Sequence, residues 1–310
     1  MCFHLAPSLQ APEERPRMRT RRQGLVFFTA LVFAVLPAQA RLNLPQSKQV
    51  VTLSGEIVRT IRANLGPSTA TAVELPVPIQ EDLLSALPQD FRGACSAMIE
   101  NWGEIVNGTA EWHVRVLIRQ ANQVWLAFRC GSRASEYVND YDERPALLRL
   151  ETGKLEFCPL GSDADNDSTL YHIEFSEVLP LESTQGVAFK VTEPAGNPCC
   201  DGPESRSGER WRVFADSPHG VAELLSVTTA RDDSSHSDDP EVDSETTYRA
   251  QITLDRDAQK LVREVAATFC EEVKDITWEG AKANPHTVSE RSGTLRYRWD
   301  PASLLFEEIK

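Results

Sequence analysis

The chain has 310 residues, of which 41% are hydrophobic, 25% charged and 7% aromatic, and its 32 basic side chains face 46 acidic ones. This length and apolar content allow one large domain or two ordinary ones with a substantial core. The composition excludes a collagen-like, coiled-coil or wholly disordered chain. A polytopic membrane protein is also excluded, because the sequence contains one apolar run of any length.

Residues 1–40 are predicted to be an export signal, with an upstream extension if translation starts at Met1 rather than Met18. Three arginines follow Met18, an apolar stretch covers 25–36, and Ala38-Gln39-Ala40 has the pattern of a cleavage site. The apolar stretch is shorter than the about 20 residues of a membrane span. We therefore expect a secreted or periplasmic protein that has no membrane attachment once the signal is removed.

The charge of the mature chain narrows its partners. Cleavage after Ala40 removes five arginines and two glutamates, which leaves a formal charge of −17. A surface of this sign repels phosphate backbones and anionic lipid head groups. Nucleic acid is therefore not expected as a partner, and an unidentified protein or glycan ligand is.

Six cysteines remain after cleavage, and an even number in an exported chain predicts up to three disulfides with 15 possible connectivities. Cys130 and Cys158 end consecutive strand patterns and form the best single candidate pair. The neighbours Cys199 and Cys200 are expected to bond separate partners, with a redox-active bond between them as the alternative. The disulfide candidates are Cys95, Cys130, Cys158, Cys199, Cys200 and Cys270.

Residues 41–108 are predicted to form an irregular lead-in with one or two helices. The first helix is expected over 50–65. The second follows Asp90, a residue type that caps helices, and its apolar residues recur at helical spacing until Asn107-Gly108 ends the run. The aromatic and methionine side chains of this second helix are expected to face the core.

Residues 109–310 are predicted to be a β-rich domain. Apolar and polar residues alternate in paired runs whose turns centre near 121, 153, 185 and 217, and a further hairpin turns at 300–303. The four turns are evenly spaced, which indicates either a repeat or a coincidence. The expected fold is mainly β, an antiparallel meander of hairpins that forms a barrel, a sandwich or a propeller-like body.

Two segments of this domain have a pattern that fits two interpretations. Residues 257–276 could line one face of a helix, but the turn Asp255-Arg256-Asp257 between two apolar runs favours a hairpin. Residues 231–246 contain seven acidic residues and no apolar face, so they are expected to form a disordered, solvated loop. A loop that attracts cations or docks a protein is the alternative.

The stretch around Asp163, Asp165 and Asp167 carries a carboxylate at every second position. Such carboxylates can converge on one hard cation, and calcium takes six to eight oxygen ligands. Counted from Asp163, Glu174 falls at the place of the last ligand of an EF-hand, but Ser168 replaces the required glycine and the flanks read as strands. The two interpretations are a calcium loop in a β-hairpin and a plain acidic turn, of which the turn is favoured.

The combination of strand, Asp-x-Asp turn, strand and terminal aromatic hairpin resembles the calcium-loop repeats of FG-GAP and VCBS type in exported bacterial proteins. The residues that carry this resemblance are Leu254-Asp255-Arg256-Asp257 with Leu261-Val262, the Asp163 loop, and Tyr297-Arg298-Trp299-Asp300. The resemblance implies a β-propeller or β-rich array used in adhesion and binding. Ser168 and Ala258 stand where the repeats carry glycines.

No short motif of a hydrolase, a zinc protease or a nucleotide-binding protein is present. His113 and His172 lie in strand patterns, His219 in a turn and His236 in the acidic segment, where a structural role explains them, so no catalytic or cofactor-binding residue is assigned. The sequence therefore predicts an exported non-catalytic protein that binds a ligand or another protein. The alternative is an exported hydrolase whose carboxylates or histidines lie on strand-end loops, which a pocket joining two such groups would favour.

Overall fold

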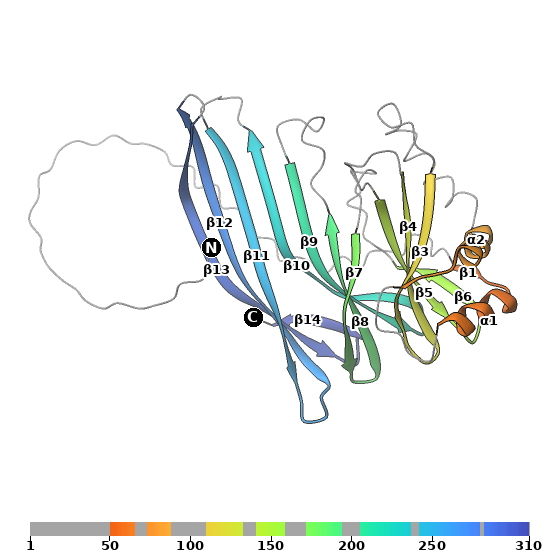
Figure 1. Ribbon diagram of the computed structural model, residues 1–310. Coiled ribbons are helices and arrows are strands. Elements are labelled where there is room, and N and C mark those ends of the chain that lie inside the picture. The colour runs from red at the N-terminus through yellow and green to blue at the C-terminus, as the bar shows by residue number, and fades with distance from the viewer. Residues whose placement is uncertain are drawn as a thin grey trace, which may run out of the picture. The chain divides into compact units, whose positions relative to one another are not determined.

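The computed structural model describes residues 50–65, 73–87, 110–132, 141–158, 172–193, 205–236, 242–279 and 282–309. These residues form two antiparallel sheets and two helices (Figure 1). The predicted mainly-β meander of hairpins is thus confirmed. The predicted signal over 1–40 and the helix predicted after Asp90 lie outside the described residues.

The smaller sheet, sheet A, has the strand order β1-β6-β5-β4-β3-β2, and consecutive strands from β3 to β6 pair as hairpin neighbours. Its strands are β1 (Val50–Thr52), β2 (Val73–Glu74), β3 (Ala110–Arg119), β4 (Gln123–Ser132), β5 (Tyr141–Arg149) and β6 (Lys154–Phe157).

The larger sheet, sheet B, has the order β14-β13-β12-β11-β10-β9-β8-β7, a meander in which every strand pairs with the next. The strand predicted after Asp255-Arg256-Asp257 is β12, so the hairpin interpretation of 248–265 is confirmed and the helical alternative is wrong. The strands are β7 (His172–Leu181), β8 (Thr184–Glu193), β9 (Ser205–Ser217), β10 (Gly220–His236), β11 (Val242–Arg256), β12 (Val262–Glu279), β13 (Lys282–Asp300) and β14 (Leu305–Ile309).

The predicted turns near 121, 153 and 217 are confirmed, and the third turn comes earlier than predicted. Thr184 to Gly186 belong to β8, where they pair with the last residues of β7. The chain reverses at Glu182 and Ser183 instead, and Ser183 has a left-handed φ of 73°. A serine rarely adopts this conformation, so the sequence did not mark the turn.

The two helices α1 (Gly55–Asn64) and α2 (Val77–Ala86) cover one face of sheet A. The side chain of Ser54 caps α1 by accepting a bond from the Ile57 N–H at 3.3 Å. Helix α2 follows Pro76, and its buried Gln80 accepts the Val114 N–H of β3 at 2.8 Å. The helix predicted over 50–65 is thus confirmed in its second part, while its first residues form β1 and pair with β6.

The opposite face of sheet A packs against β7 to β10 of sheet B. Strand β4 shows why both faces are covered, because alternate side chains enter two different cores: Phe128 packs with the helices, and Trp125 packs with sheet B. The Trp125 ring lies 5.5 Å from the Phe189 ring, which in turn lies 6.0 Å from the Phe214 ring. Sheet A is therefore a buried middle layer between the helices and sheet B.

A fully buried carboxylate joins the two sheets at one side of this layer. Both carboxylate oxygens of Glu143, on β5, accept hydrogen bonds from the Arg115 guanidinium, at 3.0 and 2.7 Å. The same side chain accepts the backbone N–H of Ile173 at 2.7 Å and lies 3.1 Å from His172 Nδ1. Because β7 is the edge strand of sheet B, this contact satisfies a backbone donor that no strand pairs.

A second buried carboxylate joins the sheets at β10. Glu156 of β6 accepts the Val221 N–H at 2.9 Å and pairs with Arg149 at 3.0 Å. Arg149 also binds Asp216 of β9 with two of its nitrogens, at 2.6 and 3.0 Å. Polar contacts therefore fix the position of the two sheets on both sides of the apolar layer.

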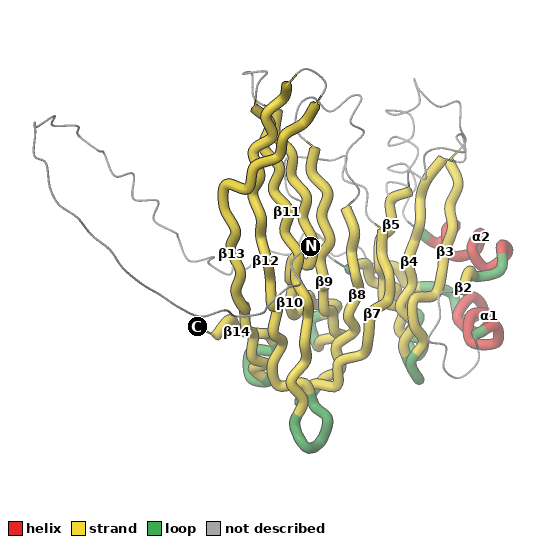
Figure 2. The backbone as a smooth tube through the Cα atoms, turned by 60° about the vertical axis from the view of Figure 1, so that its left-hand side comes forward, coloured by secondary structure: helices red, strands yellow, loops and turns green. Residues whose placement is uncertain are grey.

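The other face of sheet B forms a third core as the sheet rolls toward itself. Val213 of β9 and Val227 of β10 share this core with Val265 of β12 and Trp299 of β13. The Trp299 Nε1 donates to the backbone oxygen of Glu182, at the β7–β8 turn, at 3.2 Å. Strand β14 also contacts β10, and Figure 2 shows the long strands β10 to β13 running beside one another.

The acidic segment 231–246 is mostly strand, so its prediction as a disordered loop is wrong for the described residues. Strand β10 continues to His236 and β11 begins at Val242. Asp232 binds both terminal nitrogens of Arg249 across the ladder, at 2.7 and 2.8 Å. Backbone pairing and cross-strand ion pairs therefore form strands here without an apolar face.

The predicted Cys130–Cys158 pair is wrong. Cys158 has a free, buried thiol, whereas Cys130 is disulfide-bonded. Cys158 follows β6, and β5 lies between β6 and β4, which carries Cys130. Strands two apart in a sheet have Cα atoms at least about 9 Å apart, beyond the about 7 Å that a disulfide spans.

Neither α1 nor α2, the helices of the described part of the chain, has the length and apolar character needed to cross a membrane.

Cys270 was also predicted to form a disulfide, and it does not. Its Sγ donates to Glu290 Oε1 at 3.8 Å instead.

Candidate functional site

A pocket opens where β10 and β11 separate. The two strands pair only between Ala230–His236 and Asp243–Arg249. Nearer its start, β10 pairs with β9 alone, and a β-bulge between Thr228 and Ala230 marks the point of divergence. Strand β11 pairs with β12 along its whole length, so beyond Arg249 its other edge has no partner in β10. Bulges of this kind re-aim side chains and end strand pairing, and they are common beside functional sites.

The pocket has a volume of about 260 Å³. This is slightly below the range of about 300–1,000 Å³ that small-molecule sites occupy, so it has room for one small molecule or one unit of a larger one. Strand β10 supplies one wall, and β11 to β13 supply the other. The lining residues are Ser226, Val227, Thr228, Arg231, Tyr248, Glu271, Arg291, Leu295 and Tyr297.

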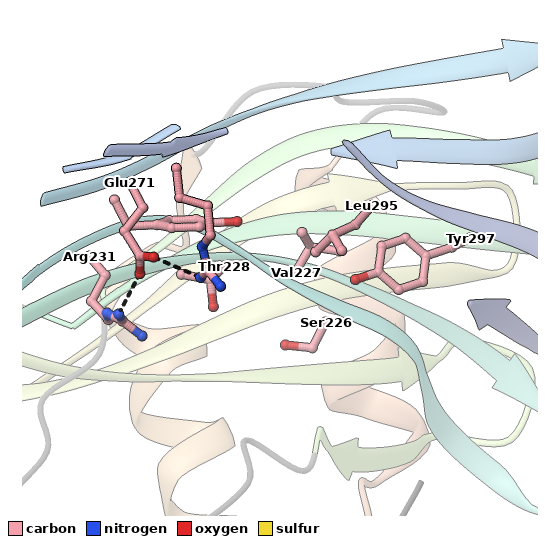
Figure 3. A pocket seen from close by; sticks show the side chains of 9 residues that line it. Ser226, Val227, Thr228, Arg231, Glu271, Leu295 and Tyr297 are labelled. Atoms are coloured by element: carbon pink, nitrogen blue, oxygen red, sulfur yellow. Dashed lines mark hydrogen bonds and ion pairs between the residues drawn. The ribbon is translucent and has the colours of Figure 1, made fainter. Parts of the chain in front are cut away.

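One end of the pocket is charged, as Figure 3 shows. Glu271 Oε1 lies 3.2 Å from Arg231 Nη2, and Glu271 Oε2 lies 2.7 Å from Arg291 Nη2. The Glu271 side chain is 16% exposed, Arg231 34% and Arg291 67%. Arg231 Nε also lies 2.8 Å from an oxygen of Asp233. The charges of this group balance, and Arg291 is its most accessible member.

The register of the sheet assembles this end. Arg231 pairs with Tyr248, Tyr248 with Glu271, and Glu271 with Arg291 across four strands. Directly opposite residues of antiparallel strands point to the same face. The four side chains therefore form one row on the face of the sheet that lines the pocket.

Aromatic rings support the charged end. The Tyr248 ring stacks on Phe269 with centroids 5.5 Å apart and planes 19° apart. The Arg291 guanidinium lies 5.6 Å from the centre of the same Phe269 ring, a cation–π contact. A Cβ at Gly293, beside Phe269 in the next strand, would approach two ring carbons to 3.1 Å, so the glycine leaves room for the ring.

Both tyrosines of the pocket remain hydrogen-bond donors at neutral pH. Burial raises the pKa of Tyr248, and the nearby charge of Glu271 raises it further against the opposing effect of the arginines. Burial also raises the pKa of Tyr297, with contributions from Glu308 and Tyr248. Figure 3 places Tyr297 and Leu295 at the opposite end of the pocket from Arg231 and Glu271.

The arrangement can bind a molecule rich in hydroxyl groups. Its lining offers guanidinium, phenol and hydroxyl donors, and Glu271, the serine and the threonine can accept. Val227 and Leu295 add apolar surface. Ser226 and Thr228 come from the part of β10 that β11 leaves unpaired. None of the lining residues is a histidine, and the lining contains a single carboxylate.

The residues that the sequence predicted as a site do not belong to this pocket. Asp163, Asp165 and Asp167 lie outside the described residues, as do Cys95, Cys199 and Cys200. Within the described ranges, no group of three or more histidine, cysteine, aspartate or glutamate side chains has the arrangement of a metal site.

Asp257, one of the acids that carry the resemblance to calcium-loop repeats, forms a turn. Its Oδ1 accepts the backbone N–H groups of Gln259 and Leu261, each at 2.9 Å. Its Oδ2 accepts Arg263 Nε at 2.8 Å. These contacts keep the pKa of Asp257 below its usual range, with the two backbone bonds and the Arg263 bond lowering it against the effect of desolvation.

Sequence reasoning missed the pocket because its residues are far apart in the chain. Arg231 lay in the predicted loop, and Tyr248 and Glu271 lay in strands whose partners were not assigned. One signal could have pointed to the pocket. Glu271 and Arg291 are charged residues at inward-facing positions of strands whose other inward-facing side chains are largely apolar.

Comparison of the chain with family models, curated proteins and solved structures finds no match.

Proposed function

We propose that this protein is an exported binding protein that holds one sugar unit of a glycan, or a similarly hydroxyl-rich small molecule, in the pocket between β10 and β11. The observation that carries the proposal is the polar lining at the strand divergence, where Arg231, Glu271 and Arg291 lie opposite Tyr297. Export is proposed from the arginine-rich, apolar and small-residue pattern of residues 18–40.

The lining fits a sugar for two reasons. A sugar hydroxyl both donates and accepts, and the pocket offers donors and acceptors side by side, such as Arg291 next to Glu271. The carbon–hydrogen faces of a sugar are apolar, and Val227 and Leu295 supply matching surface. The volume of about 260 Å³ suits a single ring.

Binding is favoured over hydrolysis by the same lining. Glycoside hydrolysis uses a pair of carboxyl groups on either side of the bond that breaks. Glu271 is the single carboxylate of the pocket, and both of its oxygens engage arginines. The group that a hydrolase would need as its second acid is not among the residues that line this site.

Ligand-detected nuclear magnetic resonance on the purified full-length chain tests the proposal. A panel of glucose, galactose, mannose, N-acetylglucosamine and glucuronic acid is expected to give saturation transfer with at least one member. The Thr228→Trp variant should lose this signal, because the indole fills the pocket and Thr228 makes no side-chain bond that folding needs. Ser292→Trp, on the exposed outer face of β13, is the matched control and should keep it.

The proposal fails if no sugar of the panel gives a signal, or if Thr228→Trp binds as well as the parent. Thermal unfolding followed by circular dichroism establishes that both tryptophan variants are folded. If Thr228→Trp does not fold, Ser226→Phe blocks the same pocket from an exposed position and replaces it in the comparison.

A further inference from the structure

We infer that the sugar bound in this pocket is acidic, and that its carboxylate binds the Arg291 guanidinium at the edge that Glu271 leaves open. The inference rests on the proposed function, because it names the ligand class of the same site. It predicts a uronic acid or a related carboxylate-bearing sugar as the natural ligand.

The two oxygens of Glu271 contact different arginines, and this geometry supports the inference. Its Oε1 contacts Arg231 and its Oε2 contacts Arg291, so neither guanidinium is held by two parallel bonds. A guanidinium has five N–H donors in a planar fork that matches a carboxylate in a two-bond geometry. Glu271 uses Nη2 of Arg291, so the rest of the fork is available to a ligand.

Three other arginines of the described residues are held differently, each by two nitrogens on one carboxylate. Arg115 binds Glu143 with two nitrogens on two oxygens, and Arg249 binds Asp232 in the same way. Arg149 likewise uses two nitrogens on Asp216. Arg291 combines a single carboxylate contact with 67% exposure of its side chain.

An aromatic ring restrains the position of Arg291, which favours specific recognition. Its guanidinium lies over the Phe269 ring at 5.6 Å, and the ring is stacked on Tyr248. A long side chain held on an aromatic face loses less rotamer freedom when a ligand arrives. The ligand carboxylate therefore meets a donor that is already oriented at the pocket end.

The surrounding charges select a ligand of charge −1. Glu271 and Asp233 lie beside the arginines, so a doubly charged phosphate would be repelled more strongly than a carboxylate. Glu271 remains paired with Arg231 when the ligand binds Arg291, so no buried charge loses its partner. The negative charge of Glu271 repels the ligand carboxylate and competes with it for Arg291. Removing this charge should therefore strengthen binding of the acidic sugar.

The test compares D-glucuronate with D-glucuronamide, which has nearly the same shape and no charge, by isothermal titration calorimetry on the full-length chain. In the parent, glucuronate should bind about tenfold more tightly than glucuronamide, as expected for a charge-assisted bond. Arg291→Gln should remove this difference, because it weakens glucuronate binding by about tenfold more than it weakens glucuronamide binding. Glu271→Gln should strengthen glucuronate binding about threefold or more.

Arg298→Gln is the matched control. Arg298 also lies on β13 and pairs with a glutamate of β12, Glu264, at 2.7 Å, but it does not line the pocket. It should leave the preference for glucuronate intact.

The outcomes separate the two proposals. Equal binding of glucuronate and glucuronamide to the parent, or a preference that persists in Arg291→Gln, overturns the acidic-sugar inference and leaves the proposed function standing. Absence of binding by both of these sugars and by every neutral sugar of the panel overturns the proposed function itself.

Discussion

Glu143 and Glu271 both form ion pairs with arginines of other strands, yet the two carboxylates differ in burial and in hydrogen bonding. Glu143 is fully buried and has four contacts, including a backbone N–H and a two-bond contact with Arg115. Glu271 is 16% exposed and contacts two arginine side chains that are themselves accessible. The same residue types thus join two sheets in one region and line a pocket in the other. Completeness of hydrogen bonding distinguishes the buried contact between the sheets from the pocket end.

The largest expected effect comes from Glu143→Ala. The substitution leaves the buried Ile173 N–H and the 17% exposed Arg115 guanidinium without the fully buried carboxylate that both contact, and breaking a buried pair in this way costs about 3–5 kcal/mol. Urea unfolding should show this loss in the free energy of unfolding. Glu264→Ala, which breaks the partly exposed pair with Arg298, should cost less than about 1 kcal/mol. Equal losses in the two variants would contradict the comparison.

The buried thiol of Cys158 should make the free energy of unfolding depend on pH, which tests the same buried layer. Burial raises the pKa of its thiol well above the usual range, and Glu156 and Glu223 raise it further. The folded protein therefore keeps this proton at pH values where the unfolded chain has lost it. The free energy of unfolding should fall as the pH rises above about 8.5, by at most about 1.4 kcal/mol per pH unit from this group.

Urea unfolding of the parent and of Cys158→Ala at a series of pH values from 7.5 to about 10 isolates this contribution. Below about pH 8 the two proteins should differ by a constant, and above it the parent should lose stability faster. Parallel curves over the whole range would show that the thiol is not buried as the structure has it. Slow alkylation of Cys158 in the folded protein is the accompanying expectation.

Glu271→Ala should cost about 1 kcal/mol or less, because its arginine partners remain in contact with water. The measurement is again the free energy of unfolding, beside Glu143→Ala under the same conditions. A loss as large as that of Glu143→Ala would mean that the pocket end is structural, and the distinction between the two regions would break down.

The hairpins of the fold were predictable from the sequence, because hydrophobic alternation is a local signal. Val124, Leu126 and Phe128 alternate with Trp125 and Ala127, and all five are fully buried in the two faces of β4. Ser54 capping α1 follows local rules as well. By contrast, helix α2 was not predicted, since its residues carry a weak helical pattern after Pro76.

The pocket was not predictable in the same way. Arg231, Tyr248, Glu271 and Arg291 meet only through the registers of three separate strand pairs. No residue type marks the point at which β10 stops pairing with β11, because the bulge after Thr228 carries no glycine or proline. The acidic residues around Asp232 also favoured a loop on composition, and the ion pairs that stabilise strands there depend on register.

The smallest expected effect on stability comes from Gly293, which leaves room for the Phe269 ring under the charged end of the pocket. Gly293→Ala would place a methyl group 3.1 Å from two carbons of the Phe269 ring, so the ring must move by a few tenths of an ångström. The expected loss of stability is below about 1 kcal/mol, because the added side chain also favours the strand. The resonances of the stacked Tyr248 ring should shift, and the Arg291 contact with Phe269 should weaken. Gly55→Ala in α1, where a Cβ meets nothing within 4 Å, is the control and should leave stability unchanged or raise it. If Gly293→Ala leaves both the Tyr248 resonances and glucuronate affinity unchanged, the ring stack does not position Arg291, and the accessible arginine alone distinguishes this region from the Glu143 contact.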